Sequence, residues 1–154
     1  MKKISTELAI KELAEYLSNF SDEFEEYKVK DENDIEIDEV KPNLVIKIKD
    51  EYKKTLRALS DGRLTFDNDL KPIYQLISPI NVGTEFELNT ITFKTRILPT
   101  VGANLARGVD LKNDASTYSL VVICHIIGLA SKNELDKLNK RDYELARELA
   151  MVFI

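Results

Sequence analysis

Residues 114–129 read DASTYSLVVICHIIGL, and this stretch decides the fold of the C-terminal third. Asp114 can accept hydrogen bonds from the free N–H groups of a helix start, and its charge suits the positive end of the helix dipole. The ten residues from Leu120 to Leu129 are apolar except for His125. The pattern therefore predicts a buried helix over residues 115–129 as the core element of this half of the chain.

Two more helices are expected after it. Ser131 and Glu134 have the spacing of a capping box, which predicts a short helix to Leu138. Asn139 can cap a last helix. Its apolar face would consist of Tyr143, Ala146, Leu149, Ala150 and Phe153.

Alternating side chains upstream of this region predict strands. Residues 91–98, ITFKTRIL, alternate until Pro99, and we expect them to form a hairpin with residues 85–88, followed by a polar loop over 100–108. Residues 35–37 and 44–48 alternate in the same way and predict a second hairpin.

Helical signals also occur in the front part of the chain. Ser5 or Thr6 can cap a first amphipathic helix that extends to Phe20. Asp50 can cap a helix that ends at Gly62, and residues 67–77 have helical spacing with Pro72 in the first turns. The expected fold class is therefore α+β, with short antiparallel hairpins packed against several helices and a helical subregion over 115–154.

An acidic stretch suggests how the chain is divided. Residues 21–39 contain ten acidic side chains but only two basic ones. They predict a solvated connector, or alternatively an electrostatic docking arm for a basic partner. We expect an N-terminal helix with this connector over residues 1–33 and a single α+β domain over 34–154.

Composition excludes several classes of partner. The 154 residues carry 22 basic and 27 acidic side chains, a net charge of −5, and the basic ones are not clustered, so nucleic acid is not an expected partner. The longest apolar run, residues 120–129, is well short of the roughly 20 residues that a membrane helix needs. Lysine and glutamate interrupt any signal-peptide core, and one cysteine permits no internal disulfide, so a cytoplasmic location is expected.

Chemistry-bearing residues are sparse. Cys124 and His125 are neighbours, so on a helix they point about 100° apart, and a zinc site needs at least three ligands. We expect a core or partly buried histidine and a buried, inert thiol. Residues 67–69, DND, lack the later ligands and the glycine of a calcium loop, and the glycines are too widely spaced to hold a phosphate. No catalytic residue, cofactor site or metal site is expected.

Four segments carry a resemblance to a known family. They are residues 97–102, ILPTVG; the helix end at 126–129, IIGL; residues 134–138, ELDKL; and residues 141–143, RDY. Together, over about residues 88–154, the chain resembles the tail assembly chaperones of long-tailed bacteriophages. Residues 1 to about 80 exceed the short strand-rich start of that family.

The resemblance implies a non-catalytic, protein-binding function. Such proteins are found in the host cytoplasm and coat the tape measure protein before the tail tube polymerises. The implied partner is a long helical polypeptide or another tail protein, with self-association into a homo-oligomer. The alternative is a structural subunit of a phage tail or baseplate, which would be part of the virion.

Three sets of residues are candidates for a protein interface. The first is the stripe of the N-terminal helix, which either its own domain or a neighbouring subunit must cover. The second is a pair of arginines that brackets residues 99–108, and the third is the apolar end of the chain, where core docking and an interface are both possible. These candidates are Ile10, Leu13, Leu17, Phe20, Arg96, Arg107, Met151, Val152 and Ile154.

Overall fold

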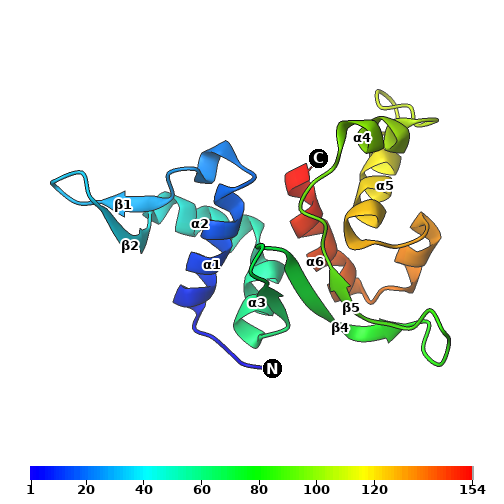
Figure 1. Ribbon diagram of the computed structural model, residues 1–154, viewed down its shortest axis with the longest axis horizontal. Helices are drawn as coiled ribbons and strands as arrows, with labels where there is room; N and C mark the ends of the chain where they lie inside the picture. The colour runs from blue at the N-terminus through cyan, green and yellow to red at the C-terminus, as the bar shows by residue number, and fades with distance from the viewer. Residues whose placement is uncertain (154) are drawn as a thin grey trace. The chain divides into compact units, whose positions relative to one another are not determined.

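A computed structural model describes residues 1–153 (Figure 1). The fold is α+β, as predicted. The chain forms two compact units, Met1–Leu64 and Thr65–Ile154. This division differs from the expected one after residue 33, because the N-terminal helix packs on elements that extend to residue 61.

Three helices form the core of the first unit. Helix α1 (Thr6–Ser18) begins where the Ser5 hydroxyl accepts a hydrogen bond from the Leu8 N–H at 3.1 Å. Helices α2 (Pro42–Glu51) and α3 (Lys53–Asp61) pack against it. Gly62 ends α3 with a φ of 78°, which confirms the predicted stop.

The predicted strand over residues 44–48 is wrong, since these residues lie in α2. Leu44 and Ile48 are buried on one side of the helix, whereas Ile46 between them is 62% exposed. Spacing by four is helical, and Pro42 fits the first turn, where its missing N–H costs no hydrogen bond. Asp50 consequently lies inside α2 and does not cap α3.

The strand that pairs with residues 36–40 lies in the acidic stretch, not in residues 44–48. After the short 3-10 helix η1 (Asp22–Phe24), β1 (Lys28–Lys30) pairs antiparallel with β2 (Glu36–Val40). In Figure 1 this ribbon projects from the helices of its unit. Every residue of β2 except Val40 is exposed.

A three-stranded sheet of order β3–β4–β5 begins at Leu64, the last residue of the first unit, and otherwise lies in the second unit. Its strands are β3 (Leu64–Phe66), β4 (Pro72–Ile80) and β5 (Leu88–Thr92). The predicted helix over 67–77 is wrong. Asp67 Oδ1 accepts the N–H groups of Asp69 and Lys71, both at 2.9 Å, and so closes a tight turn that leads into β4.

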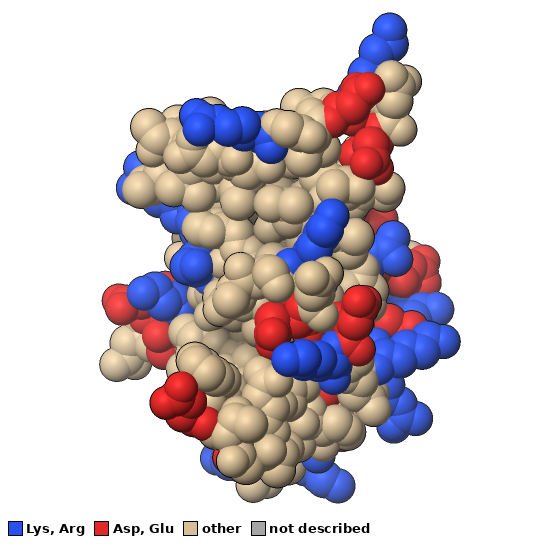
Figure 2. All heavy atoms as spheres, turned by 90° about the vertical axis from the view of Figure 1, so that its right-hand side faces the viewer, with Lys and Arg blue, Asp and Glu red and all other residues tan. Residues whose placement is uncertain are grey.

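The predicted hairpin over 85–98 and the loop after it are also wrong. Strand β5 runs straight through Asn89 and Thr90 because it pairs with β4, where Gln75 lies opposite Thr90. Residues 99–106 form helix α4 (Pro99–Ala106), with proline in the first turn. Figure 2 shows that the surface over α4, at the upper end of the view, is mostly uncharged.

The C-terminal helices follow the predicted caps. Helix α5 (Ala115–Ile127) begins where Asp114 accepts from the Thr117 N–H at 3.3 Å, and α6 (Lys140–Ala150) begins where Asn139 accepts from the Arg141 N–H at 2.9 Å. Between them, η2 (Lys132–Lys137) is a 3-10 helix, and Ser131 forms no side-chain cap. A last 3-10 turn, η3 (Met151–Phe153), follows α6.

One buried carboxylate ties α6 to β4. Asp142 has no exposed surface. Its Oδ1 accepts from the Tyr74 hydroxyl at 2.6 Å and the Ile77 N–H at 2.9 Å, and its Oδ2 accepts from the Ser78 N–H at 3.2 Å. The two backbone donors lie where the β4–β5 register shifts, so a helix side chain accepts from the strand at its irregular point.

Replacing this carboxylate should destabilise the second unit strongly. We expect Asp142→Ala to lower the free energy of unfolding by about 3 kcal/mol or more, because each buried donor left without an acceptor costs about 1 to 3 kcal/mol. Tyr74→Phe removes only one of the three donors and should cost less. Urea unfolding followed by circular dichroism measures both, and equal losses would contradict the assigned role of Asp142.

The two halves of α5 should respond differently to truncation. Ile123 is 1% exposed, whereas Leu120 is only half-buried. Ile123→Ala should therefore cost about 2 to 5 kcal/mol, the usual range for emptying a packed site, and Leu120→Ala clearly less. The same unfolding experiment compares them, and a loss below about 0.5 kcal/mol for Ile123→Ala would show that α5 is not a core element.

Candidate functional site

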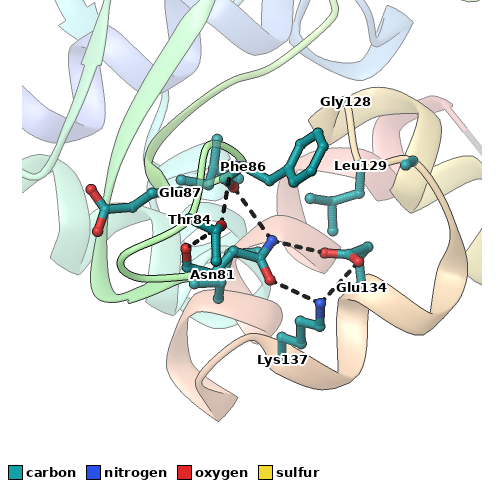
Figure 3. Close-up of a pocket in the computed structure, with 11 residues that line it drawn as sticks. Asn81, Thr84, Phe86, Glu87, Gly128, Leu129, Glu134 and Lys137 are labelled. Carbon is teal, nitrogen blue, oxygen red and sulfur yellow. Dashed lines mark hydrogen bonds and ion pairs between the residues drawn. The ribbon is translucent and has the colours of Figure 1, made fainter.

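A hollow of about 480 Å³ opens on the second unit (Figure 3). The end of β4 and the loop after it form one side, and the segment from Gly128 to Lys137 forms the other. Ile80, Leu88 and Leu129 supply apolar lining. The hollow is thus built by two segments that are distant in sequence.

A hydrogen-bonded triad of side chains crosses the hollow. Asn81 Nδ2 donates to Glu134 Oε2 at 3.2 Å. Lys137 Nζ donates to Asn81 Oδ1 at 2.8 Å and to Glu134 Oε1 at 3.0 Å. The bond from Asn81, and then that from Lys137, lower the pKa of Glu134, so its carboxylate is ionised at neutral pH.

The loop after β4 is held by its own side chains. The Thr84 hydroxyl donates to the Asn81 carbonyl at 2.7 Å and accepts from the Phe86 N–H at 3.2 Å. Asn81 itself has a φ of 54°, the left-handed region that asparagine tolerates better than most residues. These bonds fix the backbone at Phe86, whose side chain also lines the hollow.

Large apolar side chains on this loop are uncovered. Phe86 is 72% exposed and Val82 is 67% exposed. In Figure 3 the Phe86 ring extends from the loop toward the side that Leu129 lines. The site therefore combines an exposed aromatic ring, apolar walls and a fixed polar group.

This arrangement is suited to binding. Each triad member has a hydrogen-bond partner within the triad, so the triad presents fixed donors and acceptors. Such groups orient a ligand, while apolar walls supply most of the contact. Within residues 1–153, no group of three or more His, Cys, Asp or Glu side chains is placed to hold a metal ion.

The structure buries most of the first set of predicted interface residues. Ile10, Leu13 and Leu17 are at most 6% exposed because the first unit covers them. Phe20 is half-buried, with its ring 4.9 Å from that of Tyr16. The expectation that this stripe faces a neighbouring subunit is thereby corrected, because α2 and α3 of the same unit pack on α1.

The other predicted interface residues are more accessible. Arg96 and Arg107 are exposed and flank α4, which forms where a loop was expected. Met151 is 48% exposed and Val152 is half-buried. Ile154 lies outside the described residues.

Sequence reasoning missed the residues of the hollow. Asn81 and Lys137 gave no signal of their own, and Glu134 was interpreted as part of a capping box. A usable signal was the presence of two large apolar residues, Val82 and Phe86, in a polar turn that also contains Gly83 and Thr84. The triad could not be predicted from the sequence, since Asn81 and Glu134 are 53 residues apart.

Cys124 and His125 lie in α5, outside the hollow. Cys124 is buried, as predicted, and burial raises the pKa of its thiol to about 11, so the thiol is protonated at neutral pH. His125 is half-buried. Burial and then the nearby Lys94 ammonium lower its pKa from the ordinary value of 6.5.

Comparisons with protein-family models, curated proteins and solved structures give no match to this chain. In residues 1–153, every helix is too short or too polar to cross a membrane.

Neutralising Lys94 should raise the pKa of His125. Lys94 Nζ donates to the His125 carbonyl at 2.8 Å, and Lys94→Gln keeps a donor while removing the charge. The rise should stop short of 6.5, because burial is the larger cause of the shift. His125 is the only histidine, so an NMR titration reports it without ambiguity.

The same change should alter the pH dependence of stability. Because the folded state binds the His125 proton less tightly than the unfolded state, stability falls as the pH drops below 6.5. Lys94→Gln should make this fall smaller. An unchanged pKa would show that the Lys94 charge does not act on the imidazole.

Proposed function

We propose that this protein is a non-catalytic protein-binding factor in phage tail morphogenesis that chaperones the tape measure protein before the tail tube assembles. Two observations support the proposal. The resemblance to tail assembly chaperones covers about residues 88–154, and this range contains α4, α5, η2 and α6. The hollow of the second unit offers a surface that suits another polypeptide.

The proposal depends mainly on the exposure of the Phe86 side chain. A phenylalanine ring that is 72% exposed next to an apolar hollow leaves a large hydrophobic area in water. Backbone and side-chain bonds around Thr84 hold the loop in that position. A bound polypeptide would remove this area from water.

The volume and lining of the hollow suit one apolar side chain of a helical ligand. An amphipathic helix presents apolar side chains at every third or fourth position, and one of these can enter a hollow of about 480 Å³ between Phe86 and Leu129. The triad at Glu134 and Lys137 would then contact polar groups beside that side chain. This division of roles is typical of helix-in-groove recognition.

Phe86→Ser is the direct test. Truncating a central aromatic anchor costs at least about 2 kcal/mol of binding free energy, so the Kd for the tape measure protein should rise about 30-fold. Co-purification and a titration with the tape measure protein measure the change. Folding stability should change by less than about 0.5 kcal/mol, because the ring is exposed.

A matched control is Ile46→Ser. Ile46 is 62% exposed on α2 of the first unit, so it is similar in exposure but lies outside the hollow. It should leave the Kd unchanged. Equal binding by the wild type and Phe86→Ser would refute the proposed site, and presence of the protein in mature particles would favour a structural subunit of the tail or baseplate.

A further inference from the structure

The tip of the β1–β2 ribbon, residues 31–39, carries one sign of charge and exposed apolar side chains. Six of its nine residues are acidic and none is basic. Ile35 is 60% exposed and Ile37 is 37% exposed. Asp31 Oδ1 accepts the N–H groups of Asn33 and Ile35, at 2.9 and 3.0 Å, so the turn that carries these side chains has a defined shape.

Much of the charge at the ribbon tip is not neutralised. Asp38 pairs with Lys11 at 3.3 Å, and Asp34 pairs with Lys30 at 3.9 Å. Glu32 and Glu39 are exposed and form no ion pair within residues 1–153. The ribbon tip is therefore an acidic surface around two uncovered isoleucines.

The α4 surface, residues 94–109 of the second unit, has the opposite character. It contains Lys94, Arg96 and Arg107 and no acidic residue. Both arginines are exposed, and neither forms an ion pair within the part of the chain that the structure describes.

Helix α4 itself is apolar and poorly covered. It has no buried residue. Even its large apolar side chains, Val101 and Leu105, are only half-buried, and Leu98 just before it is 47% exposed. Figure 2 shows the corresponding surface as largely uncharged, with basic groups on it. An apolar helix between two arginines is thus open to a partner.

The two surfaces complement each other in charge and in apolar content. We infer that copies of this chain associate head to tail, with the ribbon tip of one copy bound to the α4 surface of the next. Ile35 and Ile37 would cover the apolar side of α4, while Glu32 in the turn and Glu39, on the same face of β2 as Ile37, would face Arg96 and Arg107. The apolar contact supplies affinity, and the charges select orientation and partner.

This contact uses a different surface on each partner, so it does not close on itself as a two-fold dimer does. Repetition gives a ring or an open chain of subunits. The inference goes beyond the proposed function and does not depend on which polypeptide binds the hollow. Its test accordingly uses the purified chain alone.

Reciprocal charge reversal provides the experiment. One variant carries Glu32→Lys and Glu39→Lys, and the other carries Arg96→Glu and Arg107→Glu. In a sample of either variant alone, like charges face each other across the contact. Its apparent Kd for self-association should therefore rise at least about tenfold. An equimolar mixture restores opposite charges at every contact and should associate nearly as well as the wild type.

Sedimentation velocity over a concentration series at low salt measures all four samples. The control is Glu25→Lys with Glu26→Lys, which makes the same change of net charge as the ribbon variant, on exposed residues outside the ribbon tip. It should associate like the wild type. Circular dichroism confirms that each variant is folded.

Several results would overturn the inference. They are a wild type that is monomeric at every concentration, single variants that associate like the wild type, and a mixture that does not recover. The pair Ile35→Ser and Ile37→Ser tests the apolar part separately, and undiminished association of that variant would also refute the contact.

Discussion

The second unit depends on the buried carboxylate of Asp142, because it joins a helix to a strand more than 60 residues earlier in the chain. Asp142 lies in the first turn of α6, where the helix dipole favours a negative charge. It accepts from the Ile77 and Ser78 N–H groups next to the end of β4. The loop that carries Phe86 starts at that end, so the position of the hollow follows from this anchor.

Local capping signals in the sequence were correct at three helix starts and wrong at two others, since Asp50 lies inside α2 and Ser131 forms no side-chain cap. Ser5, Asp114 and Asn139 each cap the helix that was predicted to follow, and Gly62 and Gly128 end their helices in the left-handed conformation. Where such interactions form, they involve only neighbouring residues and need no distant partner. The fold class followed from these helical signals together with the alternating segments.

Short apolar patterns without a cap were misinterpreted, because tertiary partners decide them. Residues 44–48 fit a strand and a helix equally well, and burial of Leu44 and Ile48 against the first unit selects the helix. Residues 72–77 form a strand because β5 and the Asp142 carboxylate satisfy its backbone. The hollow was beyond sequence reasoning for the same reason, since Asn81 contacts Glu134 and Lys137 of η2 only through the tertiary structure.

Poor burial around α4 also has a thermodynamic consequence. From Lys94 to Val121, all of which the structure describes, no residue is buried, whereas α6 contributes several. Opening this segment therefore exposes little additional apolar surface, and its local opening free energy lies far below that of the core helices. When a ligand binds α4, part of the binding free energy must offset the entropy that the segment loses on being held in one conformation. Affinity at this surface is accordingly coupled to how well ordered α4 already is, and a substitution that stiffens it would tighten binding without touching the ligand.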